Sequence, residues 1–105
     1  MKQLPPHPTL SDYQAFVAEL AVERGFDKET VPEVFTVLVE EVGELAKAIR
    51  RANGQKIDGS SKKHEVEEET ADVFWLLIDL CNRLDIDLAA SFEAKEIKNR
   101  QREWK

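Results

Sequence analysis

Val-Leu-Val-Glu-Glu-Val-Gly-Glu-Leu-Ala-Lys-Ala, residues 37–48, is the stretch on which the fold of this chain depends. Apolar side chains recur in it and beside it at intervals of three and four residues, the spacing of one face of a helix. They are Val34, Val37, Leu38, Val42, Leu45 and Ile49. Two acids lie on or beside that face, because Glu41 falls between Leu38 and Leu45 and Glu44 borders the row. A carboxylate near a buried face needs a partner, so this helix is predicted to do more than pack a core.

A second helical stretch carries acids at the same interval. Residues 67–77 read Glu-Glu-Glu-Thr-Ala-Asp-Val-Phe-Trp-Leu-Leu, and Asp72 follows Glu69 by three positions. Asp72 shares one side of the helix with Trp75, Leu76 and Asp79, so it also faces apolar neighbours. If the two helices pack antiparallel, four carboxylates converge. They are those of Glu41, Glu44, Glu69 and Asp72.

Carboxylates held close together repel one another strongly. Either some of them are protonated, or a divalent cation binds between them. Oxygen ligands without an accompanying His or Cys favour Mg²⁺ or Mn²⁺ over zinc or copper. If a cation binds here, the expected ion is therefore Mg²⁺, with Mn²⁺ as a substitute.

The composition is that of a small helical domain. The 105 residues are 42% hydrophobic and 34% charged, with four glycines and four prolines, which fits a single domain over residues 1–105. A net charge of −6 argues against binding to nucleic acid or to an anionic membrane. No apolar run approaches a membrane span and residues 1–8 do not resemble a signal peptide, so a cytoplasmic location is expected. Cys81, the one cysteine, is expected to fill the core in a reducing compartment.

Four helices are expected after an extended arm. The arm covers residues 1–8, the helices cover residues 11–24, 30–52, 61–84 and 88–104, and residues 55–63 form a polar loop. Ser11 with Gln14, and Thr30 with Glu33, have the spacing of a capping box, and Asp87 is expected to cap the last helix. Four helices joined by short connections predict an antiparallel four-helix bundle.

The last helix presents a row that is apolar at first and polar later. Its members are Leu88, Phe92, Lys95, Asn99 and Arg102. The polar half indicates that this end of the helix faces water or a ligand. Alternatively, basic side chains here only complement the helix C-terminus, which is the interpretation we adopt for Arg100 and Lys105. For Lys95, Asn99 and Arg102 both interpretations stay open.

Three kinds of site are compatible with such acids. A salt-bridged core requires matching bases, and the third expected helix has none between Glu65 and Asn82. A di-iron carboxylate bundle requires a Glu three residues before a His, which neither His7 nor His64 has, and we read both as surface residues. The third kind is a Mg²⁺ site for polyphosphate, in which basic residues of the last helix neutralise the remaining phosphate charge.

At these residues the chain resembles a known family. Residues 40–45, Glu-Glu-Val-Gly-Glu-Leu, and residues 68–73, Glu-Glu-Thr-Ala-Asp-Val, are similar to the EExxE and ExxD motifs of the all-α nucleotide pyrophosphohydrolases. That is the MazG-like superfamily, which includes dimeric dUTPases, dCTP pyrophosphatases and phosphoribosyl-ATP pyrophosphohydrolases. Residues 95–102 resemble the Lys-x-x-x-Asn-x-x-Arg segment of that family, and residues 85–88 its lead into the last helix. The likeness extends roughly from residue 35 to residue 104 and contains one module.

The resemblance implies hydrolysis of a nucleoside triphosphate between the α and β phosphates. It implies Mg²⁺ ligands at Glu41, Glu44, Glu69 and Asp72, and phosphate-binding residues at Lys95, Asn99 and Arg102. Glu40 and Glu41 would be the catalytic acids, with Glu40 orienting or deprotonating the attacking water. Trp75 or Phe74 would stack on a base, although core packing is expected for at least one of them. Family members work as homodimers or homotetramers, with the nucleotide between helices that can come from different subunits.

We therefore expect a Mg²⁺-dependent nucleotide pyrophosphohydrolase of the MazG-like all-α class that acts on deoxynucleoside triphosphates and cleans the nucleotide pool. Phosphoribosyl-ATP is the alternative substrate within the family. The alternative from another class is a non-catalytic acidic helical module that binds a basic partner. The sequence assigns no role to Asp79, which is either an extra ligand or an exposed residue.

Overall fold

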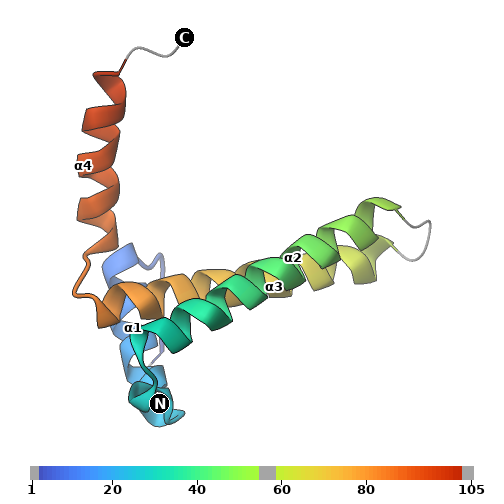
Figure 1. Cartoon of the computed structure of the whole chain (residues 1–105), viewed down its shortest axis with the longest axis horizontal. Coiled ribbons are helices and arrows are strands. Elements are labelled where there is room, and N and C mark those ends of the chain that lie inside the picture. Colours follow the sequence, from blue (N-terminus) through green and yellow to red (C-terminus); the bar gives the residue numbers. More distant parts are fainter. Residues whose placement is uncertain (1–2, 55–58, 103–105) are drawn as a thin grey trace.

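The computed structural model describes residues 3–54 and 59–102, and side chains for all of these except residues 59–63. Its elements are α1 (Leu10–Glu23), the 3₁₀ helix η1 (Phe26–Lys28), α2 (Val31–Gly54), α3 (Gly59–Arg83) and α4 (Leu88–Arg100). Every regular element in these residues is helical, so the all-α prediction is confirmed (Figure 1). The polar loop expected at residues 55–63 is shorter, since residues 59–63 already belong to α3 and residues 55–58 lie outside the described part.

The helix starts follow local capping signals. At α2, Thr30 Oγ1 accepts from the Glu33 N–H at 3.3 Å and the Thr30 N–H donates to Glu33 Oε1 at 3.1 Å, which confirms the predicted capping box. These bonds from Thr30, the backbone one first, hold the pKa of the Glu33 carboxyl below its ordinary value. Asp87 caps α4 as expected, with its Oδ1 accepting from the Ala90 N–H at 3.0 Å.

The first helix starts at a different pair from the one predicted. Thr9 and Asp12 form its capping box, with bonds of 3.1 and 2.8 Å, so the prediction of Ser11 and Gln14 is wrong. The spacing of three residues occurs twice in this segment, and Gln14 is engaged in a long-range contact with the end of α3.

The core forms where α1 crosses the hairpin of α2 and α3. Helices α2 and α3 lie side by side along most of their length, and α1 packs across the C-terminal end of α3 (Figure 1). The buried apolar residues are Val17, Leu20 and Ala21 of α1, Val34 and Ala48 of α2, and Ile78 and Cys81 of α3. Burial also raises the pKa of the Cys81 thiol, which is consistent with the expected role as core filler.

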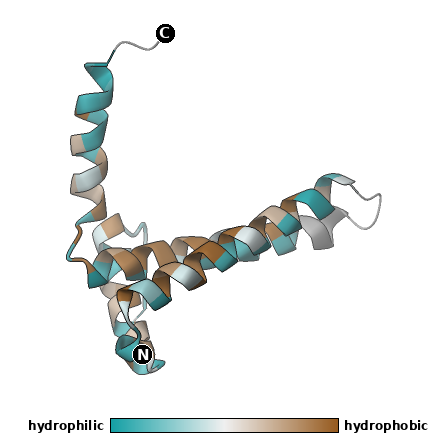
Figure 2. Ribbon diagram, viewed as in Figure 1, coloured by the Kyte–Doolittle hydropathy of each residue, from teal (hydrophilic) through white to brown (hydrophobic). Residues whose placement is uncertain are grey.

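The fourth helix leaves this core. A turn with Asp85 in the left-handed region (φ 55°) follows α3, and α4 then runs away from the hairpin and packs on α1 (Figure 1). The chain therefore does not close the antiparallel four-helix bundle that the sequence predicts. The apolar side chains of Phe92 and Ile97 on α4 are 64% and 57% exposed, and its C-terminal half is polar (Figure 2).

The turn between α3 and α4 is fixed by a side chain from α1, which explains the direction of α4. The Gln14 amide donates to Asn82 Oδ1 and to the Ile86 carbonyl and accepts from the Leu88 N–H.

None of the described helices combines the length and apolarity that a membrane span requires.

Candidate metal site

The two long helices bring together three of the predicted acids. Glu41 of α2 and Glu69 and Asp72 of α3 each place one carboxylate oxygen so that the three oxygens lie within 4.8 Å of one another. The spacing of one turn on α3 puts Glu69 and Asp72 on the same side of that helix, and the antiparallel hairpin sets Glu41 opposite them. The two acid motifs predict that four carboxylates converge, and the structure gathers three of them, without Glu44.

The electrostatics of the cluster centre on Glu69. This residue is half-buried, and its Oε2 atom is inaccessible and has no hydrogen-bond partner. Burial is the largest cause that raises the pKa of the Glu69 carboxyl, followed by hydrogen bonding to Glu41 and by neighbouring negative charge. That charge comes from Glu41, Asp72 and Glu44.

The donor set fits a hard divalent cation. Three carboxylates supply oxygen alone, and no His or Cys belongs to the group found among the described residues. Two oxygens bound to one Mg²⁺ at about 2.1 Å lie no more than about 4.2 Å apart, so acids already gathered this closely need only small side-chain rotations. The orphaned Oε2 of Glu69 is an acceptor that a cation would satisfy.

The remaining predicted acids lie outside this group. Glu44 is exposed and acts on Glu69 through its charge alone, and Glu40 is exposed on α2. The sequence predicts carboxylates in a dry interior, but Asp72 is exposed and Glu41 is half-buried. The reason is that α4 does not cover the hairpin, which leaves this face of a single chain open.

A cavity of about 380 Å³ adjoins the acids. It is lined by Arg24, Phe26, Glu29, Val37, Glu41, Asp72, Trp75, Leu76 and Asp79. Two of the three clustered acids, Glu41 and Asp72, therefore face the same space as an aromatic and apolar surface. Such a combination can hold a charged group at one end and a ring at the other.

Of the two aromatic candidates on α3, Trp75 is the one that lines the cavity. The Phe26 ring lies edge-on to it at 6.1 Å between centroids, and the Arg24 guanidinium lies 5.9 Å from the ring centroid. The indole Nε1 of Trp75 is buried without a hydrogen-bond partner. Phe74 instead packs edge-on against Tyr13 at 5.4 Å, so it serves packing with α1.

The connection between α1 and α2 forms a part of the cavity that was not predicted from the sequence. This connection supplies Arg24, Phe26 and Glu29. Gly25, with φ 77°, marks the turn that directs it back across α3, and a glycine after a helical pattern is the only sequence signal for it.

Asp79 is neither a member of the acid group nor exposed. It is 3% exposed and pairs with Arg83, whose Nε lies 3.1 Å from its Oδ2. The i,i+4 spacing of an Asp and an Arg on one helix was the available signal. Arg83 lies one residue beyond the interval from Glu65 to Asn82, which contains no basic side chain.

The predicted phosphate-binding residues lie away from the acids in a single chain. Lys95 and Asn99 are on α4 and Arg102 follows it, and none of them lines the cavity. Lys95 and Arg102 are exposed, while Asn99 Nδ2 donates to Glu96 Oε1 at 3.0 Å. Figure 1 shows that α4, which carries Lys95 and Asn99, runs away from the α2–α3 hairpin that carries the acids.

Comparison with known proteins gives one domain family and a set of relatives. Residues 26–104 match the family described as "MazG nucleotide pyrophosphohydrolase domain". The chain is 33% identical over 102 residues to dCTP pyrophosphatase 1 of Rattus norvegicus and to that of Mus musculus. It is also 33% identical over 106 residues to dCTP pyrophosphatase 1 of Homo sapiens. Each match covers 92% of this chain and 60% of the relative, so the chain spans less than two thirds of the length of these proteins.

Proposed function

The chain belongs to the MazG nucleotide pyrophosphohydrolase family, and we propose that it hydrolyses nucleoside triphosphates between the α and β phosphates. Water adds to the anhydride, and the products are a nucleoside monophosphate and pyrophosphate. The observation that carries the proposal is the gathering of Glu41, Glu69 and Asp72 within 4.8 Å of one another beside a cavity that also contains Trp75.

The acids would hold Mg²⁺, with Mn²⁺ as a substitute. Glu41, Glu69 and Asp72 supply the group of oxygens, and Glu44 is the fourth ligand in our proposal because its charge already acts on Glu69. When bound, the cation would offset the negative charge of the triphosphate and make a nearby water more acidic. The unpartnered Oε2 of Glu69 supports this assignment.

Glu40 is the proposed general base, and Glu41 the second catalytic acid. Glu40 directly precedes Glu41 on α2 and is exposed, so that its carboxylate is open to solvent. In this role Glu40 would orient the attacking water and accept its proton, while Glu41 would be one of the acids that hold the cation.

The nucleoside end of the substrate is assigned to the aromatic side of the cavity, where Trp75 would stack on the base. The cavity of about 380 Å³ is near the lower limit of ligand sites, which range from about 300 to 1,000 Å³. A single chain therefore supplies part of a binding site, and we propose that a second copy completes it.

A homodimer or homotetramer is supported by the apolar surface of α2. Phe35 and Val39 are each 54% exposed and Val42 is 48% exposed, which is costly for a free helix. In such an assembly, Lys95, Asn99 and Arg102 of another copy would bind the phosphates.

Deoxynucleoside triphosphates are the proposed substrate class, and removal of unwanted nucleotides from a cytoplasmic pool is the proposed role. The relatives are named for dCTP, which favours a pyrimidine deoxynucleotide over phosphoribosyl-ATP. Base preference depends on the shape of the aromatic wall, so a substrate panel decides it.

The test is release of pyrophosphate from each of the eight common triphosphates with Mg²⁺ or Mn²⁺. We expect pyrophosphate and a monophosphate from at least one of them, and no activity in Glu41→Gln or Asp72→Asn at unchanged helicity. Glu67→Gln is the matched control, because Glu67 is an exposed acid of α3 outside the cluster. Absence of pyrophosphate from all eight, together with melting that Mg²⁺ leaves unchanged, would replace this proposal with the non-catalytic acidic module.

A further inference from the structure

One wall of the cavity comes from a connection with little structure of its own. The segment between α1 and α2 supplies Arg24, Phe26 and Glu29 to the lining. Its regular part is the three-residue 3₁₀ helix Phe26–Lys28, and every residue from 24 to 30 is exposed. Because so little of it is buried, a contact from elsewhere must fix where this wall lies relative to α3.

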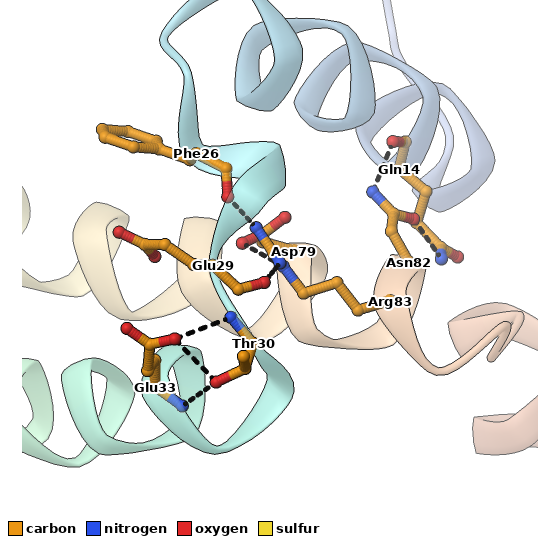
Figure 3. A network of polar contacts seen from close by, with 8 residues as sticks. All are labelled: Gln14, Phe26, Glu29, Thr30, Glu33, Asp79, Asn82 and Arg83. Carbon is orange, nitrogen blue, oxygen red and sulfur yellow. Dashed lines mark hydrogen bonds and ion pairs between the residues drawn. The ribbon is translucent and has the colours of Figure 1, made fainter.

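Arg83, the last residue of α3, provides that contact (Figure 3). Its guanidinium donates one hydrogen bond to the Phe26 carbonyl and another to the Glu29 carbonyl, and its Nε donates to Asp79 Oδ2 at 3.1 Å. Three different nitrogens thus make three bonds in fixed directions. The single ammonium of a lysine cannot reproduce this arrangement.

Asp79 balances the charge of Arg83. It lies one helical turn earlier on α3, and the side chains of Asp79 and Arg83 are 4% and 13% exposed. A charge buried to this extent requires a partner, so each residue of the pair depends on the other. Asp79 lines the cavity next to the connection but is not one of the acids in the candidate metal cluster.

The wall that Arg83 holds faces the aromatic side of the cavity. Phe26 meets the Trp75 ring edge-on at 6.1 Å, and the Arg24 guanidinium lies 5.9 Å from the same ring. The acids Glu41 and Asp72 come from α2 and α3, whose mutual packing does not involve the connection. Loss of Arg83 should therefore disturb the nucleoside end of the site and spare the metal end.

We propose that Arg83, with Asp79 as its charge partner, is a positioning residue that holds the α1–α2 connection against Trp75 and thereby sets how well the cavity discriminates between nucleobases. This inference rests on the proposed pyrophosphohydrolase function. It deepens that function by assigning substrate selectivity to a segment outside the acid motifs.

The test compares Arg83→Lys and Asp79→Asn with wild type over the eight common triphosphates. We expect KM for the best substrate to rise about tenfold, with kcat changed by less than about threefold and with unchanged Mn²⁺ affinity. The kcat/KM for the best substrate, divided by the kcat/KM for each of the other nucleotides, should fall. Arg50→Lys is the matched control, since Arg50 is an exposed arginine of α2 that does not line this cavity.

The selectivity ratio is the deciding measurement because it does not depend on the fraction of enzyme that is folded. If Arg83→Lys folds poorly, the ratio is measured on its folded fraction and on Asp79→Asn. An unchanged ratio and unchanged KM, with kcat reduced only in proportion to the folded fraction, would show that the pair is merely structural. Wild type that releases no pyrophosphate overturns the proposed function and this inference together, whereas an active wild type with unaltered variants overturns the inference alone.

Discussion

Replacement of Gln14 by methionine is expected to destabilise the protein and to loosen α4. The Gln14 side chain makes three hydrogen bonds at the turn between α3 and α4. Its Nε2 donates to Asn82 Oδ1 at 3.0 Å and to the Ile86 carbonyl at 2.8 Å. Its Oε1 accepts from the Leu88 N–H at 3.0 Å. Methionine keeps the length of the side chain and loses all three bonds.

The magnitude follows from these bonds. Each contributes about 0.5–1.5 kcal/mol net, so the three together contribute roughly 1.5–4.5 kcal/mol. The bond to Ile86 is exposed and water can replace it, whereas the other two are partly buried. We therefore expect a loss of about 2 kcal/mol, which in a domain of this size lowers the melting temperature by roughly 8–16 °C.

Gln14→Glu separates the hydrogen bonds from packing. A carboxylate still accepts from the Leu88 N–H, where the N-terminus of α4 favours negative charge, but it cannot donate to Ile86. Protonation restores a donor. The stability that Gln14→Glu loses relative to wild type should accordingly be smaller near pH 4, about the ordinary pKa of a glutamate, than at neutral pH.

Urea unfolding followed by circular dichroism measures these differences, and hydrogen exchange over residues 88–100 reports on α4. The control is Gln101→Met, because Gln101 is exposed at the C-cap of α4 and should change stability by less than about 0.5 kcal/mol. A loss below that value in Gln14→Met, or unchanged exchange in α4, would show that Gln14 does not fix this turn.

Three further predictions concern the acid cluster, the core and a helix start. Because the pKa of Glu69 is raised above 4.5, the folded state keeps its proton to higher pH than the unfolded state does, so the metal-free protein should lose stability as pH rises above that value. Glu69→Gln should lose less stability over the same pH range. Thermal melting in EDTA measures this, and parallel profiles of stability against pH for the two proteins would contradict the prediction. Ile78 is fully buried, so Ile78→Ala should cost about 2–5 kcal/mol in urea unfolding, and a cost below about 1 kcal/mol would mean that the core collapses around the cavity. Thr30→Ala removes the cap of α2 and should cost about 1 kcal/mol by the same measurement, whereas an unchanged unfolding midpoint would mean that the capping box is dispensable.

The helices could be predicted because their signals are local. Thr30 with Glu33 and Asp87 before α4 are patterns of three or four residues whose hydrogen bonds form within the pattern itself. The direction of α4 could not be predicted in this way. It depends on the contact between Gln14 and Asn82, which are 68 positions apart, and nothing in either segment specifies that pairing.

The same distinction holds at the site. Glu69 and Asp72 follow from one helical turn, and Glu41 joins them because long antiparallel helices pack along their apolar faces. The wall at Phe26 was not predicted, because a short exposed connection carries no periodic pattern and its place is set by Arg83. The expected burial of the acids was overestimated, since helical spacing shows which face a residue occupies but not whether another helix covers that face.

The most direct test of the acid cluster is a titration with Mn²⁺ in which the free ion is followed by electron paramagnetic resonance. Wild type is compared with Glu69→Gln and with Glu67→Gln, which removes the same charge from an exposed position of the same helix. We predict that wild type and Glu67→Gln bind Mn²⁺ equally, that Mg²⁺ displaces it, and that Glu69→Gln binds at least about tenfold more weakly. Equal binding by wild type and Glu69→Gln, or no binding by wild type, would contradict a metal site formed by these acids.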